Sequence, residues 1–140
     1  MLIGKYTNAL DPKGRVFVPA AFRGDLGDRF VLTRGSEDKS LYIYPMDEWK
    51  KFVEKLQQLP TSKKDSRMII RHFSSNATNC DMDSQGRILI PQELREKAEL
   101  QKEVVFIGTV NRIEIWSPEN IKEAEVEDIG TLLESLDIDF

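Results

Sequence analysis

Short apolar runs bounded by turn residues recur along the chain and predict strands. These runs are rich in β-branched and aromatic residues, which favour a pleated, half-buried conformation. Short extended segments, each leading into a tight turn, are also expected at 5–10 and 77–82. The runs expected to form strands are 15–18, 30–33, 41–44, 87–90, 104–108 and 112–116.

Apolar residues at helical spacing predict helices between and after these strands. Trp49, Phe52, Val53, Leu56 and Leu59 share one helical face after Asp47, which is expected to be the N-cap. Pro60 should end this helix, and another should run from Thr61 or Ser62 to Phe73. A third helix, 92–100, should bury Leu94, Ala98 and Leu100, and a fourth should begin after Ser117 as N-cap with Pro118 at its first position. Residues 135–140 should fray.

The chain contains an internal repeat. Residues 11–23 (DPKGRVFVPAAFR) align without gaps with residues 83–95 (DSQGRILIPQELR), at a shift of 72 positions. The Asp, Gly, Arg, Pro and final Arg are identical in the two copies. At the same shift, the run 41–44 falls opposite 113–116. Several matches in the same order indicate a tandem duplication.

Each copy begins with a tight turn that leads into a strand. Asp11 and Asp83 at the first position, with Gly14 and Gly86 at the fourth, are typical of a type I turn. Pro19 and Pro91 should stop the following strand and occupy the first position of a helix. A module of about 45 residues buries little core alone. We therefore expect the two copies to interleave into one pseudo-two-fold unit with helices packed outside.

Composition excludes several classes of protein. One cysteine and one histidine among 140 residues cannot form an internal disulfide or a four-ligand zinc site, so we expect a cytoplasmic protein without metal. The net charge of −4 is unevenly distributed. Eight acids against one lysine give residues 119–140 a charge of −7, which leaves +3 for residues 1–118. A mildly basic body with an acidic tail is compatible with DNA binding but does not require it.

The motif from Gly4-Lys5-Tyr6 through residues 10–23, and the second Asp83-x-x-Gly-Arg87 followed by Ile90-Pro91, resemble the MraZ family over nearly the whole chain. The resemblance implies an α+β fold: two tandem AbrB-like swapped-hairpin β modules forming one pseudo-two-fold β-barrel-like core with peripheral helices. The expected units are a first SpoVT-AbrB-like domain at 5–47, a helical linker at 48–75, a second domain at 76–119, and an acidic C-terminal helix or tail at 120–140.

The resemblance also implies a function. MraZ-like proteins form homo-oligomeric rings, associate with the nucleoid and bind double-stranded DNA at G-containing direct repeats near their own promoter, so regulating the division and cell-wall operon. By resemblance, the DNA-binding residues are Lys5, Lys13, Arg15 and Arg87. The second copy has Gln85 where the first has Lys13, so the first copy should make more of the phosphate contact.

The residues themselves leave two roles open for the Asp-x-x-x-Arg element. A guanidinium held at the start of a strand can bind guanine or phosphate with two hydrogen bonds, or it can simply clasp the turn. The orienting residues in either case are Asp11, Gly14, Asp83 and Gly86.

The sequence supports three other functions less well than it supports DNA binding. An enzyme is not expected, because the chain has no nucleophile–base pair or phosphate loop, and no cofactor is implied. An antitoxin-like protein-binding module that uses the acidic tail is the alternative, and RNA binding ranks third.

Overall fold

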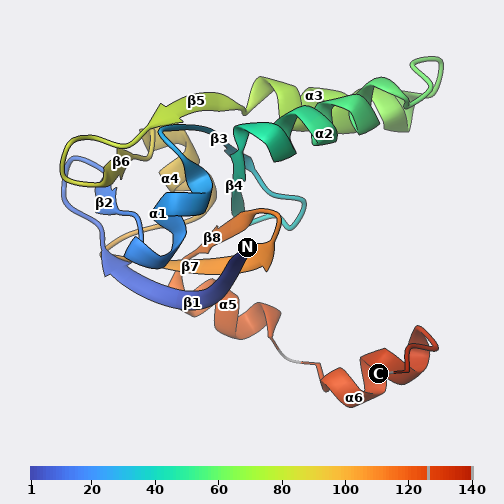
Figure 1. Cartoon of the computed structure of the whole chain (residues 1–140). Coiled ribbons are helices and arrows are strands. Elements are labelled where there is room, and N and C mark those ends of the chain that lie inside the picture. Colours follow the sequence, from blue (N-terminus) through green and yellow to red (C-terminus); the bar gives the residue numbers. More distant parts are fainter. Residues whose placement is uncertain (126, 140) are drawn as a thin grey trace.

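The computed structural model describes residues 1–125 and 127–139 and shows an α+β fold (Figure 1). Each repeat contributes strands and short helices in the same order, and a helical hairpin joins the two repeats. The strands of the described residues are β1 (Leu2–Ala9), β2 (Arg15–Phe17), β3 (Arg29–Arg34), β4 (Leu41–Pro45), β5 (Thr78–Asp81), β6 (Arg87–Leu89), β7 (Glu103–Val110) and β8 (Ile113–Trp116). The helices are α1 (Ala20–Leu26), α2 (Met46–Gln57), α3 (Lys64–Ser75), α4 (Gln92–Lys97), α5 (Pro118–Ala124) and α6 (Ile129–Ser135).

The two repeats interleave within one sheet. Six strands pair in the order β1-β7-β8-β4-β3-β5, and all neighbours are antiparallel. The counterparts in the two repeats are β1 and β5, β3 and β7, and β4 and β8. Replacing each strand by its counterpart gives the same strand order read from the opposite edge of the sheet. Strands β2 and β6 form a separate two-stranded antiparallel ribbon, again with one strand from each repeat. Neither repeat could complete its own sheet, which agrees with the expectation that the copies share one core.

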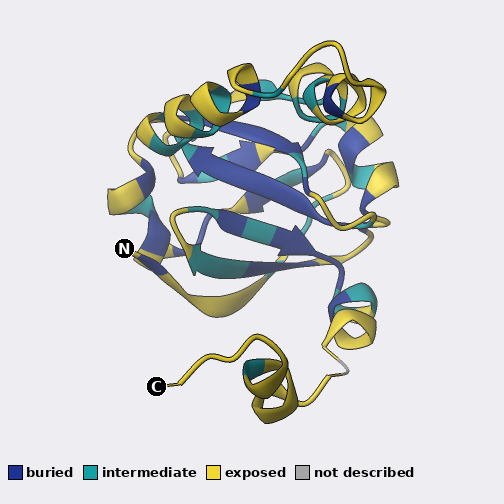
Figure 2. Cartoon of the chain, turned by 90° about the vertical axis from the view of Figure 1, so that its right-hand side faces the viewer, coloured by how far each residue is buried: buried dark blue, intermediate teal, exposed yellow. Residues whose placement is uncertain are grey.

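The core lies between the six-stranded sheet, the ribbon and the helices. Figure 2 shows buried strands enclosed by helices whose outer surfaces are exposed. The inner residues of the ribbon, Val16 and Ile88, are buried together with Phe22 of α1 and Leu94 of α4. Burial of such large apolar side chains is the main source of stability. The ribbon is therefore anchored to the core along one face only.

The helical hairpin of α2 and α3 packs on β3 and β4 and extends away from the body (Figure 1). Its contact is aromatic: Phe52 stacks on Tyr44 with ring centroids 5.1 Å apart, and Phe73 meets Phe52 edge-on at 4.9 Å. Helix α5 buries Ile121 against β7 and β8. In contrast, α6 buries none of its residues and lies apart from the body (Figures 1 and 2).

The helix termini depart from the predictions in three places. Pro19 and Pro91 are N-caps and not first helical residues, because both keep extended ψ angles of 132° and 147°. Pro45 also takes the N-cap of α2, so Asp47 lies within the first turn and caps nothing. Ser117 does cap α5 as predicted, since its hydroxyl accepts the Asn120 N–H at 3.1 Å.

Two predicted helices also end earlier than expected. Helix α2 stops at Gln57, before Leu59 and Pro60. Helix α4 stops at Lys97 because Glu99 adopts a left-handed φ of 55°. The N–H of Leu100 then donates to the Arg95 carbonyl at 2.9 Å, the pattern of a Schellman cap. Leu100 stays buried as predicted, although it lies outside the helix.

Candidate nucleic-acid interface

The two-stranded ribbon presents one exposed face built equally from both repeats. Its register pairs Arg15 with Leu89 and Phe17 with Arg87, while Val16 pairs with Ile88 on the buried side. Side chains alternate across a strand and directly opposed residues share a face. Arg15, Phe17, Arg87 and Leu89 therefore form one outward surface, which we call the ribbon face.

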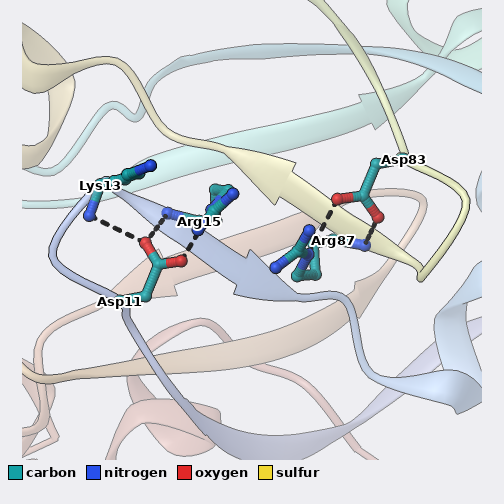
Figure 3. Close-up of polar contacts among 5 residues, drawn as sticks. All are labelled: Asp11, Lys13, Arg15, Asp83 and Arg87. Atoms are coloured by element: carbon teal, nitrogen blue, oxygen red, sulfur yellow. Dashed lines mark hydrogen bonds and ion pairs between the residues drawn. The ribbon is translucent and has the colours of Figure 1, made fainter.

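Each arginine of the ribbon face is held by the aspartate of its own turn (Figure 3). In the first repeat, Asp11 Oδ1 accepts the backbone N–H groups of Lys13 and Arg15 at 2.9 and 2.8 Å, and Oδ2 accepts Arg15 Nε at 2.7 Å. The turn itself closes through the Gly14 N–H, which donates to the Asp11 carbonyl at 3.0 Å. One carboxylate thus fixes both the turn and the guanidinium.

The second repeat reproduces this geometry. Asp83 Oδ1 accepts the backbone N–H groups of Gln85 and Arg87, both at 2.9 Å, and Oδ2 accepts Arg87 Nε at 2.8 Å. The backbone N–H of Arg15 lowers the pKa of Asp11, and that of Arg87 lowers the pKa of Asp83; the guanidinium adds to the shift in each case. Both carboxylates are consequently ionised at neutral pH.

The outer edge of each guanidinium remains available. Because Nε is occupied by the aspartate, the free edge is the one formed by Nη1 and Nη2, and these atoms donate to no residue within 1–125 and 127–139. The Arg15 side chain is 38% exposed and the Arg87 side chain 22% exposed. The pairs clasp their turns and still leave a two-donor edge accessible.

The two arginines also border one hollow, although they come from different repeats. A surface hollow of about 340 Å³ lies between the end of β1 and the ribbon, and both Arg15 and Arg87 line it. Phe17 lies in the same wall, with its ring centroid 5.9 Å from Arg87 Cζ. The remaining lining residues are Asn8, Ala9, Leu10 and Asp11. The fold therefore gathers the two predicted arginines at one place.

Comparison with known proteins gives a consistent result. The family model described as "MraZ protein, putative antitoxin-like" matches residues 1–72 and again 73–129. The chain belongs to the MraZ family. Proteins named "Transcriptional regulator MraZ" from Thermoanaerobacter pseudethanolicus and Halothermothrix orenii are each 49% identical over 99% of this chain and 100% of their own length. A protein of the same name from Caldanaerobacter subterraneus is 53% identical over 85% of this chain and 82% of its own.

Of the two lysines expected to join the MraZ arginines, the structure brings only one to the ribbon. Lys13 lies in the turn beside Arg15 and is exposed (Figure 3). Lys5 lies on the opposite face of β1, where its Nζ is 3.6 Å from the Glu125 carboxylate. The neighbouring Tyr6 points the other way, onto Phe22 of the core. Lys5 is therefore not part of the ribbon face, and its expected contact with DNA stays a prediction.

Two further arginines of the MraZ repeat support the turns, a role that the sequence motif alone does not show. Arg95 Nε donates to the Ile90 carbonyl at 2.8 Å, and its guanidinium covers Gly14 of the other repeat. Arg23 Nε donates to the Val18 carbonyl at 2.9 Å and covers Gly86 in the same way. Their identity in both copies was the available signal, since they end the aligned segment.

The remaining candidate residues are structural. Tyr42, Tyr44 and Trp116, which lie in the apolar runs expected to form strands, are buried. His72 Nε2 lies 2.8 Å from the Gly35 carbonyl, and burial raises the pKa of the Cys80 thiol to about 11. Within the described residues, no group of three or more His, Cys, Asp or Glu side chains is placed to hold a metal ion. Helices long and apolar enough to cross a bilayer are likewise absent from that part of the chain.

Proposed function

We propose that this protein regulates transcription by binding duplex DNA through the ribbon face. The observation that carries the proposal is the pair of guanidiniums, each fixed at Nε by its own aspartate and open at the Nη edge. Guanine presents two acceptors, O6 and N7, in the major groove, and a guanidinium edge can bind both at once. The relatives named transcriptional regulators support the same function.

The proposed target is the chain's own promoter, at G-containing direct repeats upstream of the division and cell-wall operon. Arg15 and Arg87 would read guanine, and Lys13 would contact phosphate beside Arg15. Each Asp–Arg pair is formally neutral, so one unit attracts the DNA backbone only weakly. A homo-oligomeric ring that places several units on successive repeats would add affinity without new contacts. Such an assembly would be nucleoid-associated.

We further propose that the interleaved arrangement is the tandem AbrB-like swapped-hairpin fold. The exchange of strands between repeats and the mutual cover of the turns by Arg23 and Arg95 support this assignment. The proposed units are 5–47 and 76–119, joined by the helical linker 48–75 and followed by the acidic segment 120–140.

The test is a gel-shift titration against duplex from upstream of the chain's own gene, at two salt concentrations. Losing one bidentate contact costs roughly 1–3 kcal/mol, so Arg15→Ala and Arg87→Ala should each weaken specific binding by about 5- to 150-fold. The matched control is Arg71→Ala, which removes an exposed cation from α3, far from the ribbon. If both ribbon variants bind like the wild type while remaining folded, the site assignment is wrong.

A second candidate function is protein binding by the acidic tail. Helix α6 and the residues after it expose Ile129, Leu136 and Ile138 within a strongly acidic segment. An apolar stripe bordered by acids suits a basic protein partner better than DNA. Recovery of one stoichiometric protein in a pull-down, with no DNA retained, would favour this function.

A further inference from the structure

Two apolar side chains occupy the ribbon face, where a purely structural ribbon would carry polar residues. Phe17 is 45% exposed and Leu89 is 55% exposed. They are at equivalent positions of the two repeats, and their buried neighbours Val16 and Ile88 already anchor the strands to the core. Exposed apolar groups at a symmetric, strand-fixed position indicate a contact surface.

Each exposed apolar residue lies beside a guanidinium from the other repeat. The register places Phe17 directly opposite Arg87, and Leu89 directly opposite Arg15. The Arg87 Cζ atom lies over the Phe17 ring, 5.9 Å from its centroid, and both residues border the hollow at the end of β1. The Phe17 backbone is itself fixed, because its carbonyl accepts Asn8 Nδ2–H at 2.7 Å. The ribbon face thus consists of two adjacent pairs, and each pair combines one cation with one apolar side chain.

The DNA major groove offers a matching surface. It is wide enough, at about 12 Å, to admit a two-stranded ribbon, and its only apolar base substituent is the C5-methyl group of thymine. Resting on the DNA-binding function proposed above, we propose that Phe17 and Leu89 contact thymine methyl groups. These thymines lie in base pairs adjacent to the guanines bound by Arg87 and Arg15. The ribbon face then reads guanine and thymine together.

A second copy of the chain is a poorer occupant for this surface. Two apolar side chains give little area to bury, and closing a protein interface over them would also remove water from two flanking guanidiniums. Their Nη donors would then lose water without gaining an acceptor, which costs more than such a small apolar contact contributes. DNA leaves the cations paired with acceptors.

The experiment removes the methyl groups from the DNA and the apolar groups from the protein in turn. The duplex from upstream of the chain's own gene is amplified once with dTTP and once with dUTP, which yields the same sequence without thymine methyls. Binding of both duplexes is measured for the wild type, Phe17→Ala, Leu89→Ala and the double variant. The matched control is Ile69→Ala, an equally exposed apolar truncation on α3. Circular dichroism verifies that each variant is folded.

Removing one methyl contact should weaken binding about fourfold, the value for burying one methyl-sized group. For one bound unit, wild type and Ile69→Ala should bind the uracil duplex about 15-fold more weakly than the thymine duplex. This ratio should fall to about fourfold in each single variant and to about one in the double variant. Uracil also changes DNA stiffness, which multiplies the ratio by the same factor in every variant, so the thymine contact is measured by the fourfold steps between variants.

Three negative results are distinguishable. If the wild type binds the upstream duplex no better than a scrambled duplex, the proposed function and this inference both fail. If binding is specific and sensitive to Arg15→Ala but the thymine-to-uracil ratio is near one, or is unchanged by Phe17→Ala, only the thymine contact is refuted. A change in assembly mass on Phe17→Ala with an unchanged ratio would show that a second copy covers this face.

Discussion

Replacing Gly14 with alanine tests how the two repeats support each other's turns. Gly14 has a φ of 87°, a conformation that costs an L-residue roughly 1–2 kcal/mol. A Cβ at this position would lie 2.7 Å from Arg95 Cζ, so the guanidinium would have to move. Moving it breaks the 2.8 Å hydrogen bond from Arg95 Nε to the Ile90 carbonyl, worth about 1.5 kcal/mol for a half-exposed charged donor.

The net effect is smaller than the sum of these two costs. Alanine also restricts the unfolded chain, which stabilises the protein by about 0.4–1 kcal/mol. Gly14→Ala should therefore lower the free energy of unfolding by about 2–3 kcal/mol. In an Arg95→Ala background the guanidinium is absent, and the same substitution should cost only about 1 kcal/mol. The difference, about 1.5 kcal/mol, is the coupling between the turn of one repeat and the helix of the other.

Urea unfolding, followed by the fluorescence of buried Trp116, measures this cycle. All variants must be compared at one protein concentration, because any assembly makes apparent stability concentration-dependent. Gly24→Ala is the matched control: Gly24 lies within α1 with nothing near its Cβ position, so alanine should stabilise the protein by roughly 0.5–1 kcal/mol. Additive effects of Gly14→Ala and Arg95→Ala would refute the proposed mutual support.

Two further predictions concern titratable groups. The pKa values of Asp11 and Asp83 should lie below 3.8 in carboxyl ¹³C NMR titrations, so the stabilisation that their ionised forms provide should be present above that pH and lost as pH falls through the lowered pKa values. Arg15→Ala should raise the pKa of Asp11 only in part, because the backbone N–H of residue 15 still donates to it; an unchanged value would show that the guanidinium has no influence. Cys80, with a pKa of about 11, should not react with a thiol reagent at pH 8 until denaturant is added, and rapid labelling of the folded protein would contradict its burial.

The local chemistry of the site could be predicted from sequence because it depends on neighbouring residues. Asp11 and Arg15 are four positions apart across one turn, and Gly14 provides the left-handed φ that the turn requires. The same spacing recurs at Asp83. Such elements form wherever their own few residues are compatible, so a motif is sufficient to predict them. The interleaving of the repeats could be predicted on a different ground, their small size, because neither repeat could bury a core alone.

The contacts of individual side chains between distant segments could not be predicted. Lys5 looked basic and adjacent to the motif, but the pairing of β1 with β7 turns it toward Glu125. Arg23 and Arg95 each act on a glycine of the other repeat, more than 60 positions away in sequence. The sequence pattern showed that these arginines recur, but only the exchange of elements between repeats explains why.

The differences between the repeats matter as much as their likeness. A unit in which the turn and ribbon strand of the two repeats were identical would bind DNA equally well in both orientations. Such a unit would suit inverted half-sites. Here the symmetry is broken in the turns, where Lys13 corresponds to Gln85, and on the ribbon face, where Phe17 corresponds to Leu89. In the proposed complex with DNA, the additional cation of the first repeat would give a unit more phosphate contact in one orientation than in the other. A series of such units would be better matched to direct repeats than to palindromes. The double variant Lys13→Gln with Gln85→Lys moves the additional cation to the turn of the second repeat. It should reverse the preferred orientation of the unit on DNA while leaving the net charge unchanged.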